Sequence, residues 1–172
     1  MKHLSIAGKA VTVLFTAALL VACSGNTKEE EDAAAAAAAA EAARAAQAAQ
    51  DAEAAAELQR LQEAAAVFGN VFFFEFDSSS LTQDAIEALN AHIAVLQNSD
   101  TSIRLEGHTD ERGTREYNMA LGERRGNSVR DYMVANGIAG HRIETVSYGE
   151  ERPVAYGSGE ANWSQNRRVE LK

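Results

Sequence analysis

EGHTDERGTREYN, residues 106–118, carries seven acidic, basic or histidine side chains in thirteen positions. It follows Ile103-Arg104-Leu105, an alternation of apolar and polar residues that is typical of a strand, and it leads into a helical pattern. The start of a helix presents backbone N–H groups without partners inside the helix, so small ligands often bind where a strand ends and a helix begins. The stretch therefore predicts a ligand site at such a junction.

Strand-like and helix-like segments alternate on both sides of this stretch, in a domain that we place at residues 68–172. The first strand should carry Phe72, Phe74 and Phe76 on one face, and Thr82 should cap the first helix. Glycine and a proline predict a loop near the C-terminus. The expected elements are strands at 71–77, 102–107, 142–148 and 168–172, helices at 83–97 and 114–136, and a loop at 149–165. This order predicts an α/β sandwich, a small mixed sheet with two helices on one face.

The second helix contains one residue that does not fit an ordinary apolar face. Arg125 lies between Leu121 and Val129 at intervals of four residues, on or beside the buried stripe of the helix. A buried guanidinium is costly unless a partner compensates its charge, and the nearest candidates are His108, Asp110 and Glu111 in the loop after the second strand. Of these, Asp110 is expected to face Arg125. Two explanations remain open. The two side chains form a structural ion pair, or they face each other across a pocket that binds a zwitterion.

Other kinds of site have weaker support in the sequence. His108, Asp110 and Glu111 are suitable metal ligands, but the histidines elsewhere have no paired spacing, so neither a metal nor a cofactor is predicted. No motif for an activated serine or cysteine nucleophile is present. An enzyme would have only His108 and Glu111 for catalysis. We therefore expect a binding protein and not an enzyme.

The N-terminus has the features of an exported protein. Residues 1–22 combine two lysines with an apolar run that is too short to span a membrane, which predicts a signal peptide. Cys23 is the only cysteine, so it has no partner for a disulfide within the chain. The segment LVAC, residues 20–23, resembles the lipobox of bacterial lipoproteins, in which the cysteine is acylated; the alternative is a buried, inert cysteine. Ser24 after the cysteine favours the outer membrane over the inner one.

The net charge of the protein limits the kinds of partner that it can bind. The chain has a net charge of −9, and residues 1–22 carry two of its 16 basic residues and none of its 25 acidic ones, so the processed chain carries −11. Nucleic acids and anionic lipid surfaces are poor partners for such a protein.

An alanine-rich spacer separates the N-terminus from the domain. Residues 23–32 read as an acidic linker, and residues 33–67 are mostly alanine with scattered charges. Alanine has the highest helix propensity, and the segment is long enough to overcome the cost of helix nucleation. We expect a helical or flexible tether, with self-association through close alanine packing as the minor alternative.

A resemblance to a known family is carried by several motifs that agree in order and spacing. They are FEFD at 74–77, EGHTDERG at 106–113, YN at 117–118, LGERR at 121–125, VSYG at 146–149 and NRR at 166–168. Together they resemble the OmpA-like C-terminal domain family over about residues 70–172, and the lipobox resembles its lipoprotein members. Gly126 departs from the alanine that is common there and costs about 1 kcal/mol in a helix interior.

This resemblance implies non-covalent binding to the meso-diaminopimelate residue of peptidoglycan stem peptides. Asp110 would bind its side-chain ammonium and Arg125 its carboxylate, with Asn118 and Leu121 shaping the pocket. Backbone N–H groups around Thr109, Asp110 and Glu111 would add donors, and Arg168 would lie at the edge. The lipoprotein members further imply a lipid anchor in the outer membrane, the periplasmic β-propeller protein of the Tol system as a partner, and a role in envelope integrity and outer-membrane invagination at cell division.

Overall fold

The computed structural model describes residues 27–172. The expected signal peptide at residues 1–22 and the lipidation site Cys23 lie outside this range. The chain divides into two units, residues 1–46 and 47–172. None of the helices in the described range combines the length and the apolar composition that are needed to cross a bilayer.

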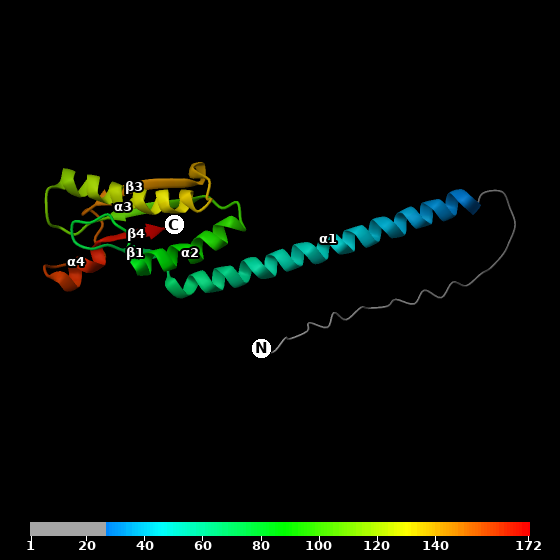
Figure 1. Ribbon diagram of the computed structural model, residues 1–172, viewed down its shortest axis with the longest axis horizontal. Coiled ribbons are helices and arrows are strands. Elements are labelled where there is room, and N and C mark those ends of the chain that lie inside the picture. The colour runs from blue at the N-terminus through cyan, green and yellow to red at the C-terminus, as the bar shows by residue number, and fades with distance from the viewer. Residues whose placement is uncertain (1–26) are drawn as a thin grey trace, which may run out of the picture. The chain divides into compact units, whose positions relative to one another are not determined.

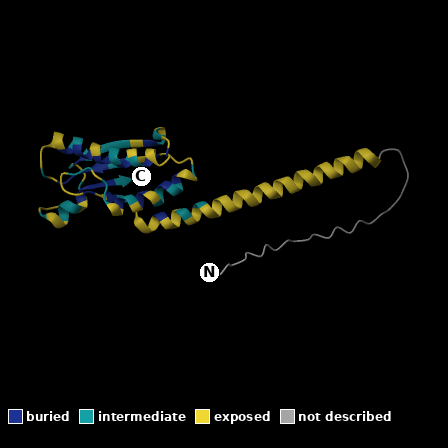
Figure 2. Cartoon of the chain, in the orientation of Figure 1, coloured by how far each residue is buried: buried dark blue, intermediate teal, exposed yellow. Residues whose placement is uncertain are grey.

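Helix α1, Thr27–Phe68, is one continuous helix of 42 residues (Figure 1). The alanine-rich spacer is therefore helical, and the helix also includes the acidic residues that we expected in a linker. Glu29 and Glu30 lie in its first turn, where they interact favourably with the positive end of the helix dipole. Nearly all of its side chains are exposed, as the yellow ribbon in Figure 2 shows; near its end Ala65 is buried.

The domain is built on a four-stranded mixed sheet in the order β1-β4-β2-β3. β2 and β3 are parallel, and β4 runs antiparallel to both β1 and β2. The strands are β1 Val71–Phe73, β2 Ile103–His108, β3 Ile143–Gly149 and β4 Arg168–Leu171. The predicted mixed sheet is confirmed.

The first strand is shorter than predicted, because the chain turns after Phe74. Asp77 has a φ of 52°, a left-handed conformation that ends an extended segment. Phe72 and Phe74 are buried as expected, but Phe76 is 57% exposed. The prediction that all three phenylalanines share a buried face is wrong for Phe76, which lies in the turn.

Two helices cover one face of the sheet (Figure 1): α2, Gln83–Gln97, and α3, Arg115–Ala135. Thr82 caps α2 as predicted, since its hydroxyl accepts a hydrogen bond from the Ala85 N–H, and Thr114 caps α3 in the same way. Both helices and all four strands contribute to one apolar core. Its largest fully buried members are Phe72, Leu89, Leu105, Met133, Ile138, Val129 and Val169.

Helix α3 approaches the sheet closely because glycines line the contact. A Cβ atom on Gly122 would meet Ser147 Oγ and lie 3.0 Å from Gly107 O, and one on Gly126 would lie 2.5 Å from Thr145 Cγ2. Gly126, unfavourable by helix propensity alone, thus lets the helix pack against β3. This close approach also brings the first turns of α3 up to the end of β2.

The segment between β3 and β4 is not a loop throughout. It contains α4, Glu160–Asn166, a helix of seven residues whose first residue follows Gly159. The prediction of a loop over 149–165 is wrong there, because two turns are too few for a helical period to stand out. A 3-10 helix, Gly140–Arg142, precedes β3.

Candidate functional site

A cavity of about 200 Å³ lies where β2 ends and α3 begins, beside the turn that follows β1. Five of the predicted site residues line it: Thr109, Asp110, Asn118, Leu121 and Arg125. The turn after β1 and the middle and end of the 106–118 stretch supply the other lining residues, Phe76, Asp77, Arg112, Gly113 and Tyr117. The charged stretch therefore does surround a pocket.

Arg125 is completely buried, and backbone oxygens hold it in place. Its Nε donates to Ser78 O at 2.8 Å, its Nη1 to His108 O at 3.0 Å and its Nη2 to Glu75 O at 3.0 Å. Among residues 27–172 no carboxylate lies within ion-pair distance of it. The explanation by a structural Asp110–Arg125 ion pair is therefore wrong.

The charge of Arg125 remains available to the cavity. Burial lowers the pKa of its guanidinium to about 10, with the nearby Asp110 carboxylate opposing that shift, so the group is still protonated at neutral pH. Three of its five N–H groups are used by the carbonyls, which leaves two. A buried cation with free donors is suited to bind a carboxylate.

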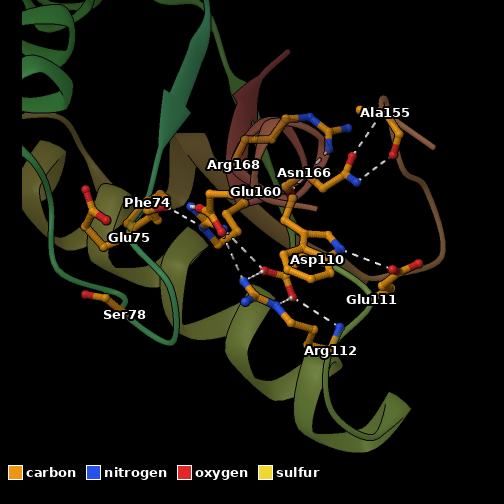
Figure 3. A network of polar contacts seen from close by, with 12 residues as sticks. Phe74, Glu75, Ser78, Asp110, Glu111, Arg112, Ala155, Glu160, Asn166 and Arg168 are labelled. Carbon is orange, nitrogen blue, oxygen red and sulfur yellow. Dashed lines mark hydrogen bonds and ion pairs between the residues drawn. The ribbon is translucent and has the colours of Figure 1, made fainter. Parts of the chain in front are cut away.

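Asp110 is buried and binds two other arginines (Figure 3). Its Oδ1 accepts from the backbone N–H of Arg112 at 3.1 Å and from Arg112 Nε at 3.2 Å. Its Oδ2 accepts from Arg112 Nη2 at 2.6 Å and from Arg167 Nη1 at 3.5 Å. Burial on its own would raise the pKa of this carboxyl, but the hydrogen bonds from Arg112 and Arg167 outweigh it and lower the pKa. Asp110 is thus ionised at neutral pH.

The guanidinium of Arg112 lies between two aromatic rings at the edge of the cavity. Its Cζ is 3.9 Å from the centre of the Phe76 ring and 4.1 Å from the centre of the Trp163 ring. Cation–π contacts of this kind stabilise a guanidinium beyond its ion pair. Arg112 therefore connects three segments: the turn after β1, the loop after β2, and α4.

The remaining cavity residues supply polar and apolar walls. The Thr109 hydroxyl is buried without a hydrogen-bond partner, while its backbone N–H donates to Gly149 O at 2.9 Å and so is not free for a ligand as we had expected. The Asn118 amide donates to Glu150 Oε2 at 2.6 Å, and Leu121 is buried and apolar. A buried hydroxyl without a partner is costly, which favours a ligand atom at this position.

Two predicted residues do not line the cavity. Glu111 accepts hydrogen bonds from Ser158 Oγ at 3.2 Å and Trp163 Nε1 at 3.1 Å, so it ties the loop after β2 to the α4 region. Arg168 donates to Glu170 at 2.7 Å and to Arg152 O at 3.3 Å. The arginine that reaches Asp110 is its neighbour Arg167. An error of one residue at the start of a strand changes which face a side chain points to.

Sequence reasoning also missed Asp77, Tyr117 and Trp163. The Tyr117 hydroxyl donates to the Asp77 carboxylate, which has no ion-pair partner among residues 27–172. The residue pattern predicts a strand at Asp77 and a loop at Trp163, whereas the structure places Asp77 in the turn after β1 and Trp163 in α4.

His108 belongs to β2 but not to the cavity. It is 2% exposed, and neither ring nitrogen has a hydrogen-bond partner. Burial, and next the charge of Arg168, lower the pKa of the imidazole to about 4, so the ring is neutral at physiological pH. In residues 27–172 no three histidine, cysteine or acidic side chains gather as metal ligands would.

The site therefore offers both signs of charge in a small space. Arg125 and the Thr109 hydroxyl can bind an anionic group, and Asp110 and Asp77 can bind a cationic one. A model of the OmpA family matches residues 73–167, which is more than half of the chain. The chain belongs to the OmpA family.

Curated relatives are named for their association with peptidoglycan. The peptidoglycan-associated lipoprotein of Pseudomonas aeruginosa is 56% identical over 110 residues, 64% of this chain and 66% of that relative. The one from Brucella melitensis is 46% identical over 109 residues, 63% of this chain and 65% of that relative. The match thus spans about two thirds of the length of these relatives. This confirms the family that the motifs indicated.

Solved structures agree with the OmpA fold. The peptidoglycan-associated lipoprotein from Burkholderia pseudomallei is 42% identical with a TM-score of 0.58, over 59% of this chain and 87% of that chain. The C-terminal domain of Helicobacter pylori MotB, 24% identical with a TM-score of 0.55 over 60% of this chain and 82% of that one, shows the fold alone. The family and these relatives agree with a structural binding protein and not with an enzyme.

Proposed function

We propose that this protein is an outer-membrane lipoprotein that binds peptidoglycan without a covalent bond, by holding the meso-diaminopimelate residue of a stem peptide in the cavity. The observation that carries the proposal is the buried Arg125, a cation that no carboxylate of residues 27–172 compensates, within one small cavity that also contains Asp110. Meso-diaminopimelate ends in an amino acid centre with one ammonium and one carboxylate. Relatives named peptidoglycan-associated lipoprotein support binding to peptidoglycan.

In this proposal each charge of the ligand has a partner. The two remaining N–H groups of Arg125 bind the ligand carboxylate, with the Thr109 hydroxyl as a further donor. Asp110 binds the ligand ammonium, and Asn118 and Leu121 limit the size of the group that enters. Glu111 and Arg168 support the surrounding loops instead of contacting the ligand.

The proposed anchor completes the link between membrane and wall. Cys23 is acylated after removal of residues 1–22, residues 23–32 and 33–67 act as the tether, and residues 68–172 hold the wall. Two attachments on one chain raise the effective concentration of each for its target, so modest affinities are sufficient. The same role makes the periplasmic propeller protein of the Tol system a partner, and extends to envelope integrity and membrane invagination at cell division.

The anchor is tested by Cys23→Ser in cells that are fed a labelled fatty acid. We expect no label on the variant and its loss from the outer-membrane fraction, because Cys23 is the only thiol in the chain. Label that stays on the variant would contradict the assignment of the anchor.

The wall-binding half is tested by co-sedimentation with purified sacculi. Asp110→Asn keeps the shape of the side chain but removes its charge, and Arg125→Lys keeps the charge but cannot bind three carbonyls and a carboxylate together. Truncation of a desolvated charge pair typically costs about 2–5 kcal/mol, so each variant should bind at least about tenfold more weakly. Asp131→Asn and Arg130→Lys, at an exposed and a half-buried position of α3 outside the cavity, are the matched controls.

A second type of cell wall tests the carboxylate contact of the ligand separately from its ammonium contact. Walls with lysine at the diaminopimelate position keep the ammonium but lack the side-chain carboxylate, so the wild-type protein should sediment with them far less. Equal sedimentation with both wall types would overturn the role of Arg125. Wild-type binding by Asp110→Asn would overturn the role of Asp110.

A further inference from the structure

The Asp110 carboxylate has no free position for a new donor. A carboxylate offers about four lone-pair positions, two on each oxygen. Oδ1 accepts from the backbone N–H and from Nε of Arg112, and Oδ2 accepts from Arg112 Nη2 and Arg167 Nη1. A ligand ammonium that binds Asp110 must therefore replace one of these donors.

The four donors differ in how easily they can leave. Arg167 is buried, with 5% of its side chain exposed; it also donates to Phe74 O at 3.0 Å and contacts Glu160. The backbone N–H of Arg112 is fixed by the loop. The Arg112 side chain is 30% exposed and lines the cavity, and its other charged neighbour, Glu160, is 3.9 Å away. The guanidinium of Arg112 is thus the donor with the most room to move, whereas Arg167, whose bond to Asp110 is the longest of the four, is held in place by Phe74 O and Glu160.

We propose that the ligand ammonium displaces the Arg112 guanidinium from Asp110, so that Arg112 acts as an internal counter-ion that occupies the cation position of the empty site. This proposal rests on the proposed binding of diaminopimelate. It adds a basis for specificity: a ligand without a cation cannot replace Arg112 and must leave the contact in place. The Asp110 carboxylate then has a cationic partner both with and without the ligand.

Trp163 lies where it can report the displacement. It is the only tryptophan in the chain, and its ring stacks on the Arg112 guanidinium at 4.1 Å. Its indole N–H is bound to Glu111 Oε1 at 3.1 Å, independently of Asp110. Movement of the guanidinium should change the emission of Trp163 while the ring itself stays in place.

The experiment titrates the full chain, in detergent micelles, with the tripeptide L-Ala-γ-D-Glu-meso-diaminopimelate. Calorimetry gives the affinity and tryptophan fluorescence gives the state of Arg112. The test variant is Arg112→Met, which keeps an apolar side chain between Phe76 and Trp163. The matched control is Arg115→Met, which removes an equal charge three residues away, where Arg115 pairs with Glu151 at the surface.

We expect a saturable change in Trp163 emission for the wild type and for Arg115→Met. Arg112→Met should bind the tripeptide about three- to tenfold more tightly, because the competing cation is gone, and should show no such change. Arg112→Lys should restore competition for Asp110 and bring the affinity back toward the wild-type value.

Two results would overturn the displacement. The first is wild-type binding of the tripeptide with unchanged Trp163 emission. The second is weaker binding by Arg112→Met, which would make Arg112 a ligand contact and not a competitor. If the tripeptide binds neither the wild type nor Arg112→Met, the proposed binding of diaminopimelate is overturned together with the displacement. The experiment therefore distinguishes failure of the displacement alone from failure of the proposed function.

Discussion

Helices α1 and α3 are stabilised in opposite ways. α1 has 42 residues, half of them alanine, with Ala65 as its buried residue, so its stability comes from backbone hydrogen bonds and from the propensity of alanine. α3 has 21 residues, contains Gly122 and Gly126, and buries Asn118 and Arg125. Its stability comes from contacts with the sheet and with neighbouring loops.

This difference shows why the same residue has opposite meanings in the two helices. A glycine in α1 would only lower helix propensity. In α3, Gly122 and Gly126 bring the helix against β2 and β3, where a Cβ would clash with Gly107, Ser147 or Thr145. The gain in packing offsets the intrinsic cost of about 1 kcal/mol for each glycine.

The largest effect is expected where α3 meets β2. A Cβ on Gly107 would clash with the carbonyl oxygen of Gly122, a backbone atom that cannot rotate away. We expect Gly107→Ala to reduce the free energy of unfolding by more than about 3 kcal/mol, the upper end for overpacking. Urea denaturation followed by Trp163 fluorescence measures it. The control is Gly140→Ala, where a Cβ would meet the end of the flexible Arg130 side chain at 3.2 Å and Val134 Cγ2 at an ordinary 3.7 Å. Equal, small losses in both variants would mean that α3 does not need its close approach.

Acid is expected to have an intermediate effect on stability, and to destabilise only the domain. His108 in the folded protein has a pKa of about 4, below the ordinary value of 6.5, so between these values the unfolded chain binds a proton that the folded chain does not. Stability is therefore complete above pH 6.5 and is lost as the pH falls toward 4. At pH 5 the loss should be about 2 kcal/mol.

Two features separate the effect of His108 on stability from the effects of other titrating groups. The lowered pKa values of Asp110 and Glu170 act only below the ordinary values of carboxyl groups, so they contribute little at pH 5. His108→Phe keeps a ring beside Tyr148, whose ring centre lies 5.5 Å from that of His108, and cannot be protonated. Urea midpoints at pH 7 and pH 5 should differ for the wild type and agree for the variant. If the wild type and the variant lost equal stability at pH 5, the proton responsible would bind to a group other than His108.

The smallest effect is expected in α1. Ala45→Gly and Ala49→Gly lie at exposed positions, and each should reduce local helix stability by about 1 kcal/mol. Circular dichroism at 222 nm should show the loss of helix, while the urea midpoint of the domain, read from Trp163, should stay unchanged. A shifted midpoint would show that the domain depends on this part of α1.

Much of the fold was predictable because it follows from periodicity. The mixed sheet, the two covering helices and the N-cap at Thr82 were all visible as residue patterns. The burial of Arg125 was also predictable from its place between Leu121 and Val129. Its partners were not, because a guanidinium can be satisfied by backbone carbonyls, here those of residues 75, 78 and 108, and no side-chain pattern marks where a carbonyl will point.

The surroundings of Asp110 were less predictable for a different reason. Arg112 reaches back to it within one tight loop, and Arg167 comes from the far end of the chain. Arg167 and Arg168 are adjacent, and which of them points toward Asp110 depends on where β4 begins. Sequence alone places that boundary only to within a few residues.

The dependence of α1 on its own backbone has a mechanical consequence. At about 1.5 Å per residue its 42 residues span about 63 Å as a helix, whereas the same residues fully extended reach about 140 Å. With few tertiary contacts to break, its turns can open one after another under a modest pull, and helix formation is fast enough to close them within microseconds once the load is gone. The alanine helix would then act as an elastic element that lengthens before force reaches the charged pocket.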